Sequence, residues 1–453
     1  MMNNELRLAT HDLRFLLEKL DLKSSLSWRY LYSQKFITDK QKLESEFNKI
    51  EETILFLNDK TNNKIFADIE HKLSQILDIG GSLQNLSNSL VLGDIELFEI
   101  KKFSIIVDDI KQHLQKINLI DLPDLSEVIN ILDPEKTRIA TFYIYDAYST
   151  EIASLRKLIK EKNSSSNGEL YQQIIEIEDK IRKQLSEKLK IHTENLVAAL
   201  SKIAYLDLLI AKSKQAINEH FCKPEIVDEI TSYKGLFNPE ITELLNKQGR
   251  KYQPVDICFG KYPTLITGIN MGGKTVLLKT IALSQYLCQY GFYVPASDAK
   301  IAIVDKIMIC INDEQNHLQG LSSFAAEMKN VNEILSETIT NKRLLVLIDE
   351  LARTTNPAEG SAIVNAMLDM LCERNICSFI TTHYDKINSD CRRLRVRGFT
   401  ENIDIKNEKN IEQYIDYSLI EDTETNVPHE AIRIAEILGV DAELIERARK
   451  KMS

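Results

Sequence analysis

The stretch Gly268-Ile-Asn-Met-Gly-Gly-Lys-Thr275 decides the fold class of this 453-residue chain. It matches the pattern G-x-x-x-x-G-K-[ST], in which glycines let the backbone curl around phosphate oxygens and present N–H groups to them. A β-rich run at residues 264–267 precedes the stretch, and an amphipathic helix is predicted over residues 274–290 after it. A strand, a glycine-rich loop and a helix in this order predict a phosphate-binding loop in an α/β domain.

Within this loop the charged and hydroxyl side chains have separate expected roles. Lys274 is predicted to reach the β- and γ-phosphates of ATP, and the Thr275 hydroxyl is predicted to ligate Mg²⁺. The residues expected to bind the nucleotide are Gly268, Asn270, Met271, Gly272, Gly273, Lys274 and Thr275. ATP and Mg²⁺ are therefore the expected ligands. The pattern does not identify the residue that stacks on adenine, and Tyr252 and Phe259 are both candidates.

A second motif supplies two adjacent carboxylates. The apolar run Leu344–Ile348 predicts a buried strand that ends at Asp349 and Glu350. A central parallel strand delivers both acids to the carboxyl edge of the sheet, beside the phosphate-binding loop. There Asp349 is predicted to hold Mg²⁺, and Glu350 is predicted to orient and deprotonate the attacking water. Paired acids alone also occur where a strand ends in solvent, and the neighbouring loop favours the catalytic interpretation.

One histidine belongs to the same predicted edge. His383 follows the predicted strand Ser378–Thr381 by two residues. A lone histidine is usually structural or merely exposed. Because parallel strands end at a common edge, His383 is predicted to act in catalysis as a sensor of the γ-phosphate.

The sequence pattern changes near residue 235, from helical spacing to alternating strand and helix patterns. Pro123 and Pro134 are the prolines that precede Pro224, and apolar stripes at helical spacing fill this front region. One helix is predicted over much of residues 169–215, about 65 Å long at ~1.5 Å per residue, as either a lever arm or part of a bundle. Beyond 235, β-rich runs alternate with helical patterns and predict a mainly parallel sheet. The predicted strands are 263–267, 301–304, 307–311, 344–348 and 378–381, and the predicted helices are about 274–290, 324–340 and 359–374.

Composition and charge exclude several classes of protein. The 57 Lys and Arg against 67 Asp and Glu give a net charge of −10, so no protein-wide positive field attracts nucleic acid. The basic run Arg392–Arg397 is local, and its alternation favours a solvated strand face over an anion-binding one. Without a signal peptide or an apolar stretch of about 18 residues, we expect a cytoplasmic protein with no membrane segment. Seven scattered cysteines without metal-ligand spacing predict reduced thiols.

Five segments together resemble the ATPase of the MutS family in order and spacing. They are Thr267–Thr275, Tyr293-Val-Pro-Ala296, Ser322-Ser-Phe-Ala-Ala-Glu-Met328, Ile348-Asp-Glu-Leu351 and Thr382-His-Tyr384. The resemblance implies an ABC-type P-loop ATPase that works as a homodimer, in which a serine loop of each subunit completes the partner's ATP site. Here that loop is Gly320–Ser323, so Ser322 and Ser323 are expected to bind nucleotide. A plain helix N-cap is the alternative role for Ser322.

The resemblance extends more weakly to the rest of the chain. Trp28-Arg-Tyr-Leu31 and Phe142–Tyr148 resemble the helical core and lever of the family, and residues 428–448 resemble its closing helical segment. The fold class implied is α plus α/β. The implied domains are a helical core/lever domain over 1–235, a P-loop ATPase domain over 236–420 and a C-terminal helical dimerisation segment over 421–453.

The resemblance also implies a function. Ile269, Val276 and Ala352 depart from the usual residues of the family but leave the groups for Mg²⁺ and water activation in place. Because the chain begins near the core and ends at Ser453, we expect no mismatch-reading, connector or Smr domain. The expected activity is hydrolysis of ATP to ADP and phosphate by a dimer in DNA transactions of the mismatch-repair or recombination type, without canonical mismatch reading.

Two other functions compete with this one. Some short MutS-like proteins resemble the ATPase component of reactivating factors for cobalamin-dependent aminomutases, such as lysine 5,6-aminomutase. The partners would then be a protein client and a co-chaperone subunit instead of DNA. A nucleotide-binding scaffold without turnover is disfavoured, because all the residues named for catalysis and metal binding are present.

Overall fold

The structure is a computed structural model, and it describes residues 10–115, 117, 119–161, 168–269, 272–311, 323–341, 343–384, 387–399, 414–422, 432, 435, 436 and 439–452. Contacts divide the chain into two compact units. The first unit holds the described residues of 20–34 and 48–214, and the second holds those of 10–19, 35–47 and 215–452. None of the helices in the described ranges is long and apolar enough to cross a membrane.

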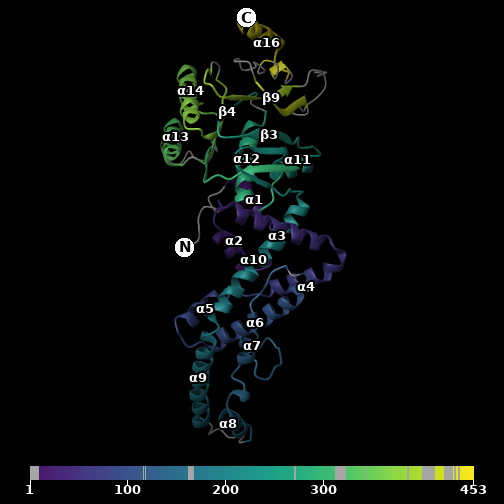
Figure 1. The fold of residues 1–453 in the computed structure, drawn as a ribbon, viewed down its shortest axis with the longest axis vertical. Helices are drawn as coiled ribbons and strands as arrows, with labels where there is room; N and C mark the ends of the chain where they lie inside the picture. Colours follow the sequence, from purple (N-terminus) through teal and green to yellow (C-terminus); the bar gives the residue numbers. More distant parts are fainter. Residues whose placement is uncertain are drawn as a thin grey trace. The chain divides into compact units, whose positions relative to one another are not determined.

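The first unit is helical in the part that the structure describes. In Figure 1 its elements follow the purple-to-teal part of the colour bar. They are α2 (Ser25–Ser33), α3 (Lys40–Asn58, which begins in the second unit), η1 (Lys60–Asn62), α4 (Asn63–Ser74), α5 (Gly80–Ser87), α6 (Asp94–Leu114), α7 (Ser126–Leu132), η2 (Asp146–Tyr148), α8 (Thr150–Glu161), α9 (Gly168–Lys190) and α10 (Thr193–Asn218, which ends in the second unit). Helix α6 packs against α4, α5 and α7, and most of its apolar side chains are buried, although Ile95 is exposed. The mainly helical front predicted from the sequence is confirmed.

The single long helix predicted over much of 169–215 is wrong, because α9 and α10 are separate helices. The break falls at Ile191 and His192, and the Ile191 residue is 84% exposed. The Thr193 hydroxyl donates to the carbonyl oxygen of Lys190 at 2.8 Å, a local bond that competes with the helical ladder. Residues of low helix propensity therefore interrupt the helix without Pro or Gly. Helix α9 packs against α5, α7 and α8.

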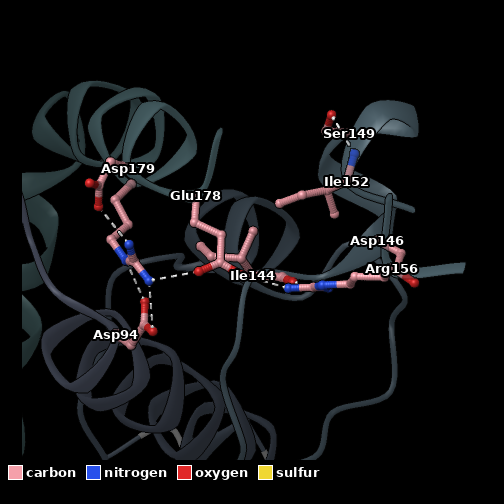
Figure 2. Close-up of polar contacts among 9 residues, drawn as sticks. Asp94, Ile144, Asp146, Ser149, Ile152, Arg156, Glu178 and Asp179 are labelled. Carbon is pink, nitrogen blue, oxygen red and sulfur yellow. Dashed lines mark hydrogen bonds and ion pairs between the residues drawn. The ribbon is translucent and has the colours of Figure 1, made fainter. Parts of the chain in front are cut away.

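Ion pairs join α8 and α9 within this unit (Figure 2). Arg156 of α8 donates from Nη1 to Asp146 at 2.6 Å and from Nη2 to Glu178 of α9 at 2.9 Å. Arg182, one turn after Glu178, donates from Nε to Asp94 at the start of α6 at 2.8 Å. Arg182 also lies 3.4 Å from Glu178, so Glu178 lies between two arginines of different helices and the network links α8, α9 and the start of α6.

The second unit contains two sheets. The six-stranded sheet has the order β10-β9-β4-β8-β7-β6, and it is parallel except for β10, which pairs antiparallel with β9. Its strands are β4 (Pro263–Thr267), β6 (Lys306–Cys310), β7 (Leu344–Ile348), β8 (Cys377–Thr381), β9 (Arg392–Phe399) and β10 (Ile415–Glu421). Every residue of β4 and β7 is buried, as expected for central strands covered on both faces. The mainly parallel α/β sheet predicted from the sequence is confirmed.

The second sheet is four-stranded, with the order β1-β5-β2-β3. Its strands are β1 (Glu225–Val227), β2 (Thr231–Leu236), β3 (Val255–Phe259) and β5 (Asp298–Ala302). The strand predicted at 301–304 is therefore β5, shifted toward its N-terminus and placed in this sheet. The helices of the unit are α1 (His11–Glu18), α11 (Pro239–Lys247), α12 (Lys274–Gln289), α13 (Ser323–Thr340), α14 (Pro357–Glu373) and α16 (Ala442–Met452). Helix α12 packs against β7 and β8, α13 against β6, and α14 against β4.

Segments from the front of the chain complete this unit. The ring of Phe36 packs edge-on against Tyr286 and Tyr290 of the α12 region, with centroids 6.2 and 5.6 Å away. The N–H of Ile37 donates to the carbonyl oxygen of Gln289 at 2.8 Å. Residues 10–19 and 35–47 are thus part of the α/β unit, although the sequence places them more than 200 residues before the first strand of its six-stranded sheet.

Candidate active site

The phosphate-binding loop lies between β4 and α12, as predicted. Gly268 has a φ of +130° and Gly273 a φ of +71°, conformations that residues with a Cβ rarely adopt. A Cβ at Gly268 would also lie 3.1 Å from the Cβ of Val396 on β9. The two glycines therefore allow the tight path from the end of the strand into the first turn of the helix.

Lys274 begins α12, and its ammonium group points back into the loop. Nζ donates to the carbonyl oxygens of Gly268 at 2.7 Å and Ile269 at 3.0 Å. Burial lowers the pKa of Lys274, while the charges of Glu350 and Asp349 oppose that shift. Phosphate oxygens at a helix N-terminus are better partners for an ammonium group than neutral carbonyls. The loop and its lysine therefore fit a polyphosphate.

Two hydroxyl groups hold the Asp349 carboxylate at the end of β7. Thr275 donates to Oδ2 at 2.6 Å, and Thr381 at the end of β8 donates to Oδ1 at 2.6 Å. The Thr381 oxygen in turn accepts the backbone N–H of Glu350 at 2.8 Å. A hydroxyl and a carboxylate at hydrogen-bond distance, next to the phosphate loop, are oxygen donors of the kind that Mg²⁺ prefers. The donor set therefore fits Mg²⁺.

The Glu350 carboxylate lies between two basic side chains. His383 Nε2 is hydrogen-bonded to Oε1, and Arg353 donates from Nη1 to Oε2 at 2.7 Å. The His383 hydrogen bond is the largest factor that lowers the pKa of Glu350, burial opposes it, and the charges of Arg353 and Lys274 add to the lowering. Glu350 is consequently held as a carboxylate that can accept a proton.

The turn after β7 is held by contacts that the sequence did not reveal. Glu350 and Ala352 have φ values of +51° and +62°, the left-handed region. Both backbone groups of Ala352 are bonded. Its N–H donates to Glu327 of α13 at 2.8 Å, and the carbonyl oxygen of Ala352 accepts the Tyr384 hydroxyl at 2.5 Å. A Cβ on Gly360 of α14 would overlap the Tyr384 ring at 2.3 Å. Buried polar contacts thus fix the backbone that aims Glu350.

A cavity of about 580 Å³ opens beside the glycines that end the phosphate loop. Its lining is mostly apolar and includes Tyr252 and Tyr417, and the Tyr417 ring would lie 3.4 Å from a Cβ on Gly273. Of the two candidates for stacking on adenine, Tyr252 lines the cavity. Phe259 is 3% exposed and packs edge-on against Phe379, with centroids 4.9 Å apart.

The structure brings together Gly268, Gly272, Gly273, Lys274, Thr275, Asp349, Glu350 and His383 at the carboxyl ends of the parallel strands. Asn270, Met271 and Ser322 lie outside the described residues, as does the side chain of Ser323, whose backbone starts α13. Sequence reasoning missed Thr381, Glu327 and Tyr384. The signal for Thr381 was the parallel pairing of Ile348 with Ile380, which makes Thr381 the neighbour of Asp349.

The basic run of β9 forms contacts within the protein. Leu394 and Val396 are buried, as the alternation predicts. Arg392 donates from Nε to Glu421 at 3.0 Å, and Arg397 lies 3.4 Å from Asp416 of β10. Acidic partners on the next strand therefore neutralise part of this run.

Comparisons with known proteins agree with this geometry. Residues 264–453 match the family model of MutS domain V. Proteins named endonuclease MutS2 are similar to this chain: 34% identical over 320 residues in Fusobacterium nucleatum, 38% over 217 in Ruminiclostridium cellulolyticum and 30% over 335 in Caldicellulosiruptor saccharolyticus. These regions cover 67%, 46% and 72% of this chain and 36%, 26% and 39% of the relatives, so the chain spans less than half of their length. With the phosphate loop, the paired acids and His383 all inside the matched domain, the chain belongs to the MutS family.

Proposed function

We propose that this chain is a MutS-type ATPase that binds ATP with Mg²⁺ and hydrolyses it in DNA transactions. One observation carries the proposal: four functional side chains, Lys274, Thr275, Asp349 and Glu350, meet at the carboxyl ends of β4 and β7 although up to 76 positions separate them in the sequence. This is the arrangement that phosphoryl transfer requires, because catalysis there is mainly positioning and charge stabilisation.

Each of these residues has a chemical role in the proposed reaction. Lys274 exchanges the loop carbonyls for phosphate oxygens and stabilises their negative charge. Thr275 and Asp349 would hold Mg²⁺, which when bound neutralises charge on the phosphates. Glu350 orients the attacking water and takes its proton at a carboxylate oxygen, since its lowered pKa leaves that oxygen free of a proton at neutral pH. His383 holds Glu350 in place at the γ-phosphate end of the site.

The cavity beside Gly272 and Gly273 is the proposed base pocket. It continues from the phosphate loop, and its apolar lining offers the flat faces of Tyr252 and Tyr417. Aromatic faces stack on any base, so this pocket supplies affinity more than selectivity. Asn270 and Met271 are proposed to complete the phosphate contacts.

We further propose that the ATPase works as a homodimer with composite sites. Ser322 and Ser323 of one protomer would contact the γ-phosphate held by its partner, and residues 421–453 would support the dimer. The division into a core/lever domain (1–235), an ATPase domain (236–420) and this segment is part of the same proposal. A helix N-terminus such as that of α13 is suited to bind phosphate oxygens.

The choice of DNA as the partner rests on the relatives. The relatives are named endonuclease MutS2, and that name describes only them. Because this chain spans 36–39% of their length, we propose no nuclease activity for it. The alternative, an ATPase of a reactivating factor for a cobalamin-dependent aminomutase, gains no support from these names. It is kept as an outcome of the experiment.

The test measures the ATPase rate of the full chain alone, with duplex or branched DNA, and with an inactivated aminomutase. DNA is added at about 50 and 200 mM salt, because binding through phosphate contacts falls steeply over that interval. We expect stimulation by DNA that weakens with salt. If the aminomutase raises the ATPase rate and no DNA does, the role in DNA transactions is refuted and protein remodelling is supported.

A variant pair tests the chemistry itself. Glu350→Gln is expected to lower turnover by about 10²–10⁴-fold, the usual contribution of a general base, while ATP still binds. The matched control is Glu373→Gln, an exposed glutamate at the end of α14, which should leave turnover unchanged. Equal rates for Glu350→Gln and the unaltered chain would refute the role given to Glu350.

A further inference from the structure

Three side chains capable of binding a metal meet away from the ATPase site. His11 and Asp12 begin α1, and Glu240 lies in the first turn of α11. One ligand atom from each of the three lies within 4.8 Å of the others, and no second group of this kind is found within the described ranges. His11 Nδ1 is 3.1 Å from Glu240 Oε2. The chain thus places an imidazole and two carboxylates together across 229 positions of sequence.

The Asp12 carboxylate provides a second, independent observation. Asp12 is 7% exposed, and its Oδ2 atom is buried with no hydrogen-bond partner among the residues that the structure describes. Burial raises the pKa of Asp12, and the negative charge of Glu240 raises it further. A hydrogen bond with the Asn238 side chain and the positive charge of Lys279 lower it in part. A buried carboxylate oxygen without a partner is costly, so a cation bound at this point would remove that cost.

The donor types match a transition metal, and so does the distance between two of the three ligand atoms. Bonds of about 2.0–2.2 Å at tetrahedral angles separate neighbouring ligand atoms by about 3.3 Å, close to the 3.1 Å between His11 and Glu240. Imidazole favours Zn²⁺ and its neighbours over Mg²⁺ and Ca²⁺, and carboxylates disfavour Cu⁺. The side chain of His11 is 73% exposed and that of Glu240 26% exposed, which gives an ion access from solvent.

We propose that His11, Asp12 and Glu240 form a binding site for a divalent transition-metal ion, with Zn²⁺ the best match and water in the fourth position. Such an ion would join α1 to α11, two helices that already contact each other. The site requires no nucleotide and uses none of the residues assigned to ATP.

The site is also connected to the cavity. Glu240 is followed by Ile241, which lines the cavity, and the side chain of Asn238 caps α11 by accepting the N–H of Ile241 at 3.1 Å. The same side chain donates to Thr280 of α12, another lining residue, at 3.3 Å. Metal binding is therefore expected to tighten nucleotide binding, a consequence that rests on the proposed function, whereas metal binding itself does not.

The experiment titrates the metal-stripped full chain with Zn²⁺ by calorimetry, without nucleotide, and repeats the titration with Co²⁺ to record its absorption spectrum. The variants are His11→Asn and Glu240→Gln. The controls are His71→Asn and Glu229→Gln, side chains that lie outside the cluster. We expect one equivalent to bind, with affinity reduced more than about 100-fold in both variants and unchanged in the controls, since even indirect partners of a metal contribute about 10–100-fold.

Each outcome decides the matter. A cobalt spectrum without thiolate charge-transfer bands supports the N/O ligand set, and loss of binding in the two variants supports the named residues. Equal affinity in all variants, or thiolate bands, would assign the metal to cysteines and overturn the proposal. Absence of binding to the unaltered chain would overturn it as well. A second titration, of ATP into the chain with and without bound Zn²⁺, tests the link to the cavity. Equal ATP affinity in the two would refute that link and leave the metal site itself in place.

Discussion

The Thr381 hydroxyl donates a hydrogen bond to Asp349 at 2.6 Å, and the oxygen of that same hydroxyl accepts the N–H of Glu350 at 2.8 Å. One side chain from β8 therefore orients both acids of β7. Thr381→Val keeps the shape but removes the hydrogen bond, so we expect kcat to fall by about 10-fold or more with a smaller change in ATP affinity. Steady-state kinetics measures this.

Thr381→Ser separates positioning from packing, because serine keeps the hydroxyl and loses only the methyl group. We expect it to restore most of kcat. If the serine variant is as slow as the valine variant, packing of the methyl group is responsible and the positioning role is wrong.

Ala352 has a φ of +62° in a turn where the MutS resemblance leads one to expect glycine. The left-handed conformation costs a residue with a Cβ about 1–2 kcal/mol, and glycine loses about 0.5–1 kcal/mol more on ordering. Ala352→Gly is therefore expected to raise the free energy of unfolding by up to about 1 kcal/mol in urea denaturation. The control Ala366→Gly, on the exposed face of α14, should lower it by about 1 kcal/mol. Destabilisation by both would show that the Ala352 turn stores no strain.

Glu327 is buried, and burial raises its pKa above the usual value of 4.5. A raised pKa in the folded state means that stability falls as the pH rises from about 4.5 through the folded-state pKa. Glu327→Gln keeps an oxygen that can accept the Ala352 N–H and cannot ionise. The variant should match the original chain at pH 4 and exceed its stability at pH 7. Denaturation at both pH values tests this, and a variant that is less stable at pH 7 contradicts it.

The proposed base pocket predicts a loss of affinity on removal of an aromatic face. Stacking on a base contributes about 1–3 kcal/mol, so Tyr252→Ala should weaken ATP binding by about 5- to 150-fold in calorimetry. Phe259→Leu alters the other candidate, which packs against Phe379, and is expected to leave affinity unchanged. Weaker ATP binding by Phe259→Leu, with no weakening by Tyr252→Ala, would instead make Phe259 the residue that stacks on adenine.

Local patterns predicted the centre of the α/β unit well. The strands 263–267 and 344–348 were predicted with their observed bounds, because fully buried parallel strands are continuous apolar runs bounded by loop residues. The break at Ile191 was not predictable in this way, since no Pro or Gly marks it and weak propensities decide it.

The site residues that belong to a local sequence motif could be predicted. Those that are brought to the site by tertiary contacts could not. Lys274, Thr275, Asp349 and Glu350 follow from local patterns next to strands. Thr381 needed the register between β7 and β8, and the meeting of His11 with Glu240 depends on the packing of two helices from opposite halves of the chain.

The way in which Phe36 packs against Tyr286 and Tyr290 has a consequence for biosynthesis. About 250 residues must be translated after Phe36 before its partners exist, which at ~5–20 residues per second takes roughly 12–50 s. During that interval the apolar side chains of residues 10–19 and 35–47 cannot yet pack against the α/β unit. The α/β unit can therefore close only late in synthesis, and its high contact order predicts slow, chaperone-sensitive refolding.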